Sequence, residues 1–140
     1  MDLSDIPLFA MLKSRMGYLS QRQRVIAENV ANANTPGYAP HELKPFSFQA
    51  QVQAAAAGPG AIAVTQPGHM LPPSAAGSSA ASFKPVATKD SETTLDGNSV
   101  VLEEEMMKMS DARVDYDAAV SFYQKALNMI TLATRAPGHG

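Results

Sequence analysis

The sequence has no cysteine, no tryptophan and no uninterrupted apolar run long enough to cross a membrane. The lack of cysteine excludes disulfide frameworks and thiolate zinc sites. The uncharged stretch from Gln49 to Phe83 is broken by prolines and glycines, so it cannot form a spanning helix of roughly 20 apolar residues. Asp2 and Asp5 stand where a cleaved secretory signal carries positive charge, and no such signal is expected.

Basic residues are not in excess either. The chain has 11 Lys and Arg against 13 Asp and Glu, a net charge of -2, which does not suit binding to nucleic acid phosphates. His41, His69 and His139 lie far apart without metal-ligand spacing. The acidic run Glu103 to Glu105 is interpreted as a solvated surface near the start of a helix, because no nucleophile or phosphate loop accompanies it. We therefore expect no enzyme, no cofactor and no catalytic or metal-binding residue.

Proline is almost absent from both ends of the chain. Eight of the ten prolines lie between Pro36 and Pro85. Because proline inside a helix costs about 3 kcal/mol, each arm is free to form one long helix and the middle is not. The predicted fold is all-α, with two long terminal helices packed as a coiled-coil-like hairpin around a long Pro/Ala/Gly-rich loop. The predicted divisions are residues 1–38, a flexible or loop-rich middle over 39–95, and 96–140.

The first arm shows a seven-residue apolar repeat, which predicts a helix from about Pro7 to Ala33. Ser4 or Asp5 is expected to cap its start, and Pro36-Gly37 is expected to form a type II turn after its end. The repeat predicts a helix-seam interface made of Phe9, Leu12, Met16, Leu19, Ile26 and Val30.

The second arm repeats the pattern from about Ser99 to Arg135, with Asn98 or Ser99 as the expected cap. A column of alanines at 112, 119, 126 and 133 lies beside its stripe and would let another helix approach closely. Gln23 and Arg113 interrupt the two stripes, either at hydrated gaps or as residues that set the helix register. The predicted seam of this arm consists of Leu102, Met106, Met109, Tyr116, Val120, Tyr123, Leu127 and Ile130.

The string NVANANTPGY, residues 29–38, follows directly on the first amphipathic helix. Asparagines that bind the last carbonyls and a Pro-Gly turn would by themselves describe an ordinary helix end. As a whole, the string resembles the signature of the flagellar rod, hook and hook-associated protein family. The residues that carry this resemblance are Asn29, Asn32, Asn34, Thr35, Pro36, Gly37 and Tyr38.

A second segment, DGNSVVLEEEM at residues 96–106, resembles the opening of the C-terminal helix in the proximal-rod members of that family. The residues that carry this second resemblance are Asp96, Gly97, Asn98, Val100, Leu102, Glu103, Glu105 and Met106.

The resemblance implies a structural subunit of the bacterial flagellar proximal rod, whose terminal helices assemble into a helical tube that transmits torque and encloses the export channel. It implies contacts with copies of itself, other rod proteins, the adaptor between rod and MS ring, and the export gate. It also implies a place in the basal body, in a rod that spans the periplasm, after type III export without a cleaved Sec signal.

The alternative is a helical adaptor or chaperone of a type III export system. Independently of the resemblance, apolar stripes at both ends of one short chain suit head-to-tail assembly, because two helices alone bury too little surface for stability.

Overall fold

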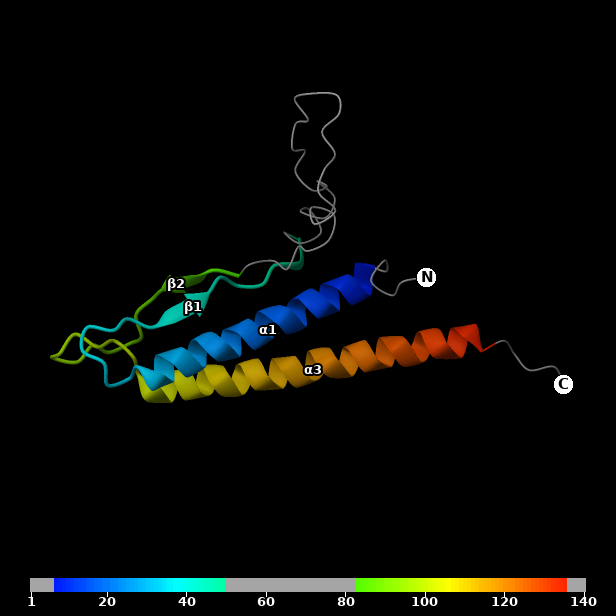
Figure 1. The fold of residues 1–140 in the computed structure, drawn as a ribbon. Coiled ribbons are helices and arrows are strands. Elements are labelled where there is room, and N and C mark those ends of the chain that lie inside the picture. The colour runs from blue at the N-terminus through cyan, green and yellow to red at the C-terminus, as the bar shows by residue number, and fades with distance from the viewer. Residues whose placement is uncertain (1–6, 50–82, 136–140) are drawn as a thin grey trace, which may run out of the picture. The chain divides into compact units, whose positions relative to one another are not determined.

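The computed structural model describes residues 7–49 and 83–135. Its elements are α1 (Pro7–Ala31), β1 (His41–Leu43), β2 (Pro85–Ala87) and α3 (Leu102–Thr134), as Figure 1 shows. All four belong to one compact unit, and the described residues 45–49 belong to a second. In the described part of that second unit, the rings of Phe46 and Phe48 stack edge to face with centroids 5.2 Å apart.

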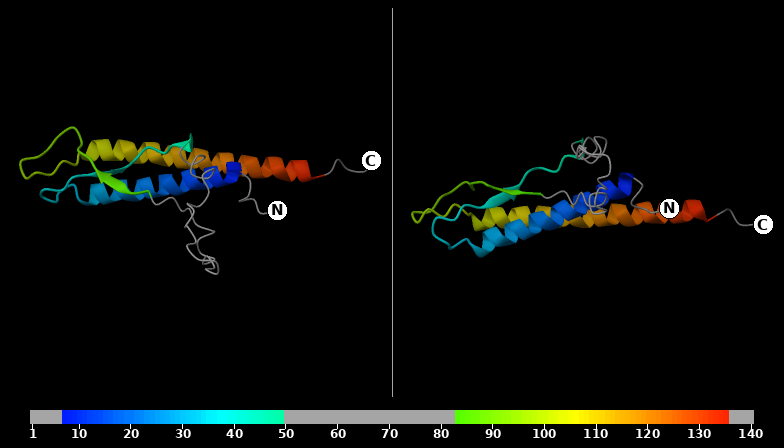
Figure 2. Two further views of the ribbon diagram at one scale, coloured as in Figure 1. Left: turned by 90° about the horizontal axis from the view of Figure 1, so that it is seen from above. Right: turned by 45° about the horizontal axis from the view of Figure 1, so that its top comes forward.

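The two long helices lie side by side and run in opposite directions (Figures 1 and 2). Near the start of α1, the ring of Phe9 packs edge to face on Tyr123, with centroids 5.2 Å apart. Near its end, the Asn29 amide donates to the Glu105 carboxylate at 2.8 Å. The predicted two-helix fold is therefore confirmed. Among the residues that the structure describes, neither helix has the length and apolar content that crossing a bilayer demands.

The core between the helices combines large side chains of α1 with small ones of α3. Leu19 and Ile26 of α1 are 1% and 3% exposed, and α3 carries a column of buried alanines. Small side chains allow the two backbones to approach closely. The sequence analysis placed this column beside the packing stripe, and the structure brings it close to α1: the Gln23 amide donates to the Ala112 carbonyl at 3.4 Å, and Ala126 lines a groove with Leu8 and Leu12. The buried alanines are Ala112, Ala119 and Ala126.

The alanine column makes a testable prediction about packing. Ala119→Leu should destabilise the chain by about 1–3 kcal/mol, because the added methyl and methylene groups would have to displace α1 from a filled interface. Ala118→Leu, one residue away on an exposed surface of α3, should change the free energy of unfolding by less than about 0.5 kcal/mol. Urea unfolding of the full chain, followed by circular dichroism, compares the two; equal effects would show that α1 does not pack on this column.

The residues predicted to form the seam are divided between core and surface. On α1, Met16 and Val30 are half-buried and the other four are buried. On α3, Leu102 and Met106 are exposed. Contact of the exposed members with a neighbouring copy stays a prediction. The half-buried members on α3 are Met109, Tyr116, Val120, Tyr123, Leu127 and Ile130.

The helix ends differ from expectation by small amounts. α1 ends at Ala31, about two residues before the expected end, because the chain tightens there: the Ala33 N–H donates to the Val30 carbonyl three residues back. The Asn32 side chain donates to the Glu28 carbonyl at 2.8 Å. The Pro36-Gly37 turn is confirmed, since the Thr35 carbonyl accepts from the Tyr38 N–H and Gly37 has φ 70°.

The start of α3 corrects the predicted cap. The residue before the helix is Val101, which provides no side-chain cap, so the expected cap by Asn98 or Ser99 is wrong. Both residues are instead buried in the preceding loop, where Asn98 makes other hydrogen bonds. The Val101 N–H donates to Asp90 at 2.9 Å. The other end is as predicted, with Arg135 directly after the last helical residue.

A short antiparallel pairing of β1 and β2 was not predicted. Its register pairs His41 with Ala87 and Leu43 with Pro85. Strands of three residues are too short to show a period of two in the sequence, and proline is tolerated at a sheet edge. β1 packs on α1 through the Arg22–Glu42 ion pair at 3.3 Å. The expected caps Ser4 and Asp5 and the expected extended piece at 61–65 lie outside the described residues.

Candidate functional site

Asn29, in the last turn of α1, is the centre of a buried polar cluster. Its side chain is fully buried, and all of its hydrogen-bonding capacity is used. The amide nitrogen donates to the His41 carbonyl and to Glu105, each at 2.8 Å. The amide oxygen accepts from the His41 N–H at 2.9 Å and from the Tyr38 hydroxyl at 3.3 Å. One side chain thus joins α1, the turn after it, β1 and α3.

Glu105, in the first turn of α3, is also fully buried and belongs to the same cluster. Its second oxygen accepts from the Lys108 ammonium at 2.7 Å, and the same ammonium donates to Asp90 at 2.8 Å. Partial burial alone would lower the pKa of Lys108, but hydrogen bonds to Asp90 and Glu105 raise it above its ordinary value. The lysine therefore stays charged and balances one of the two carboxylates.

Tyr38 also belongs to the cluster, through its hydroxyl and its ring. Burial raises the pKa of the Tyr38 hydroxyl, and the carboxylates of Glu28 and Glu105 raise it further. The hydroxyl consequently keeps its proton and can donate to Asn29. The Tyr38 ring packs edge to face on His41, with centroids 5.8 Å apart. His41, which the sequence analysis set aside as isolated, thus contacts two residues of the motif through its ring and backbone.

Asn98 joins the two motif segments. Its side-chain nitrogen donates to the carbonyls of Asn32 and Thr35 at 2.9 and 2.7 Å, and its side-chain oxygen accepts from the Val100 N–H. The asparagine is 2% exposed, so these bonds form away from bulk water. The loop before α3 is therefore attached to the turn after α1.

The backbones of the two segments meet at two glycines. Gly37 and Gly97 both have positive φ, 70° and 83°. A Cβ on Gly97 would lie 3.5 Å from the Gly37 Cα, and the Gly37 N–H donates to the Asp96 carbonyl at 3.0 Å. The nearby Asp96 carboxylate accepts from the Thr94 hydroxyl and the Asn98 N–H, and these bonds lower its pKa. Positive φ at both positions is the conformation that glycine adopts without strain.

The structure thus brings together most of the motif residues predicted from the sequence, although they lie about 60 positions apart. Asn34 and Pro36 are exposed, as are Leu102, Glu103 and Met106 of the second segment. Val100 is buried. The interpretation of Glu105 as solvated is wrong, because Asn29 and Lys108 bind it in the interior.

Sequence reasoning did not find Lys108 or Asp90. A signal for Lys108 was present, since it follows Glu105 by three residues on the helix, where such pairs interact. Asp90 lies in a loop 18 residues from Lys108, and no local pattern marks it.

The buried polar cluster joins α1, the turn after it, β1 and α3 through hydrogen bonds and an ion pair. Among the described residues, no buried side-chain nitrogen or oxygen lacks a hydrogen-bond partner. The polar groups of the cluster are committed to one another, and removal of any one leaves a buried group unpaired. The cluster therefore fixes the C-terminal end of α1 and the N-terminal end of α3 in one register.

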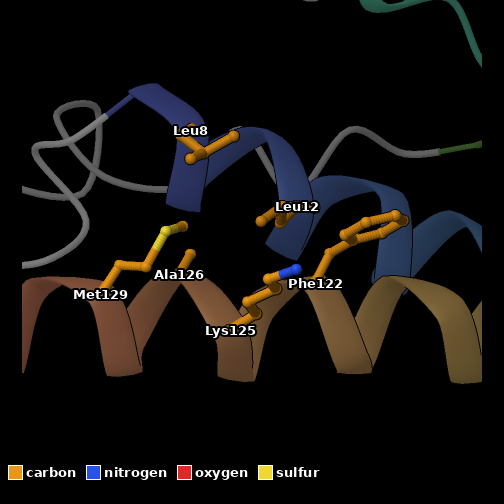
Figure 3. Close-up of a pocket in the computed structure, with 6 residues that line it drawn as sticks. All are labelled: Leu8, Leu12, Phe122, Lys125, Ala126 and Met129. Carbon is orange, nitrogen blue, oxygen red and sulfur yellow. The ribbon is translucent and has the colours of Figure 1, made fainter.

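A second feature is the amount of apolar surface left uncovered on α3. Such patches are typical of interaction sites. At its C-terminal end, α3 forms an apolar groove with the first turns of α1, where Leu8 and Leu12 face Phe122 and Met129 (Figure 3). Leu8, Phe122 and Met129 are each more than half exposed. The other exposed large apolar side chains of α3 are Leu102, Met106, Met107, Val114 and Leu132.

Comparison with known proteins gives two matches. Residues 11–38, which hold most of α1 and the motif turn, match the family model described as "Flagella basal body rod protein". The chain is also 32% identical over 133 residues to the flagellar basal body rod protein FlgB of Agrobacterium fabrum. That alignment covers 95% of this chain and 96% of the relative.

Proposed function

The chain belongs to the flagellar basal body rod protein family, and we propose that it is a structural subunit of the proximal rod. The observation that supports this role best is the buried polar cluster around Asn29 and Glu105. It joins the two segments that resemble the family and sets two long helices in a fixed register. A subunit that repeats along a polymer needs such a defined shape, because any variation in the relative position of its two helices would be repeated at every contact.

The proposed mode of action is mechanical. Subunits assemble through α1 and α3 into a helical tube, which transmits torque and encloses the export channel. The apolar side chains left exposed along α3 support this mode, since burial against neighbours gives them the favourable environment that one copy lacks. The role requires no catalysis, and among the described residues every buried side-chain nitrogen and oxygen has a hydrogen-bond partner.

The proposed partners are copies of the same chain, other rod proteins, the adaptor that joins the rod to the MS ring, and the export gate. The proposed location is the basal body, in the part of the rod that spans the periplasm. Export through the flagellar type III apparatus, without a cleaved Sec signal, completes the proposal.

Purified basal bodies test the function. Cells that lack the chain should be non-motile and should form no complete rods, and a tagged copy should restore both and co-purify with basal bodies in several copies per particle. The competing role is a helical adaptor or chaperone of type III export. A chain absent from basal bodies but bound stoichiometrically to one export substrate would support that role and overturn the rod assignment.

A further inference from the structure

Two exposed apolar patches lie at opposite ends of α3 and carry opposite charge. The acidic patch, in the first turns of α3, consists of Leu102, Glu103, Met106 and Met107. The C-terminal groove consists of Leu8, Leu12, Phe122, Lys125, Ala126 and Met129. Figure 3 shows Lys125 among the apolar side chains of the groove.

We propose that the acidic patch of one copy docks into the C-terminal groove of a second copy, with Glu103 beside Lys125. This inference rests on the proposed function and names the contact that it uses. Met106 is 62% exposed and Phe122 is 63% exposed, so each patch has apolar surface to bury. Neither Glu103 nor Lys125 has an ion-pair partner elsewhere in the described ranges 7–49 and 83–135.

The geometry of α3 allows the two patches to meet only between copies. Met106 and Met129 are 23 residues apart on one continuous helix, which is about 35 Å along the axis and roughly 140° around it. They cannot touch within one chain. A neighbour in the same orientation, displaced along the axis, can present its acidic patch to the groove.

The symmetry of the contact follows from the difference between its two sides. An isologous pair would have to join both patches of one copy to both patches of the other at once, but about 140° around α3 places the two patches on different sides of the helix. The contact is therefore heterologous, and each added copy leaves one patch of each kind free. Repetition of the contact gives an open, polar assembly.

Cysteine cross-linking tests this contact directly, because the natural sequence has no cysteine. The double variant Met106→Cys/Met129→Cys should replace the normal chain in cells, and its basal bodies should be oxidised and resolved without reducing agent. We expect covalent dimers and higher multiples, since every copy carries both cysteines. The matched controls, Met106→Cys and Met129→Cys alone, should stay monomeric, since a disulfide requires Cα atoms within about 7 Å.

Several outcomes would overturn the contact while leaving the rod role intact. These are basal bodies with a normal amount of double variant but only monomers, a disulfide dimer from either single variant, or a cross-link to a different protein. Absence of the normal chain from basal bodies would instead overturn the proposed function together with the contact.

Charge exchange provides a second test that does not depend on disulfide geometry. Glu103→Lys or Lys125→Glu alone should lower the number of complete rods per cell by about 1.4- to fivefold, the fold-change that corresponds to one exposed ion pair. The double exchange should restore the normal number, because it recreates the pair with reversed sign. A double exchange that assembles no better than the worse single variant would contradict the contact.

Discussion

Asn29→Asp should abolish rod assembly and destabilise the chain by about 3–5 kcal/mol, the cost of breaking a buried polar pair. The substitution keeps the size of the side chain but replaces the donor to Glu105, now at 2.8 Å, with a carboxylate oxygen. Two carboxylates would then face each other in the interior, and the His41 carbonyl would lose its bond from Asn29. Denaturant unfolding of the full chain and counts of basal bodies with complete rods measure the effect.

Asn34→Asp provides the matched control within the same motif. Asn34 is exposed, so the same chemical change should alter stability by less than about 0.5 kcal/mol. The pH dependence separates electrostatic repulsion from simple misfolding. A like-charge neighbour raises the pKa of a carboxyl group in the folded state, so the folded variant binds more protons than the unfolded one. Asn29→Asp should therefore regain stability as the pH falls; a loss that is the same at all pH values would contradict this account.

Glu105→Ala should cost about 3 kcal/mol and strongly reduce the number of complete rods. The variant leaves the Asn29 amide with one acceptor fewer and Lys108 with Asp90 alone. We place the cost at the low end of the range for a broken buried pair, because the Lys108 side chain is 25% exposed and water screens it in part. Denaturant unfolding at neutral pH gives the free energy.

The same prediction has a control and a double variant. Asp111→Ala removes an exposed carboxylate from α3 and should change stability by less than about 0.5 kcal/mol. Glu105→Ala/Lys108→Ala should cost less than the sum of its single changes, because the pair is already broken in either one. Additive costs would show that Glu105 does not act through Lys108.

The pH range over which this pair stabilises the chain follows from Lys108. The pKa of Lys108 is higher in the folded chain than its ordinary value of 10.5, so the folded state holds the proton more tightly. The stabilisation from its ion pairs is fully present below about pH 10.5 and declines as the pH rises above that value. At physiological pH the buried polar cluster therefore keeps the full stabilisation from the ion pairs of Lys108.

Much of the fold could be predicted because its signals are local. The absence of proline from each arm and the seven-residue repeat predicted both long helices, and the Pro-Gly pair predicted the turn with positive φ at Gly37. The predicted ends of the helices were slightly wrong where side chains bind backbone groups at those ends. Asn32 bonds back to Glu28 at the end of α1, and Asp90 takes the Val101 N–H in place of the cap expected from Asn98.

The sequence by itself determined where the helices lie, which side of α1 is apolar and which two segments resemble the rod family. These properties depend on residues a few positions apart. Only the tertiary structure decided that the two segments meet, that Glu105 is buried rather than solvated, and that alanines of α3 are buried while its larger stripe is half-buried or exposed. The physical reason is that burial depends on what the partner helix presents, and the bonds from Asn29 to Glu105 and from Asn98 to Asn32 join positions 76 and 66 residues apart.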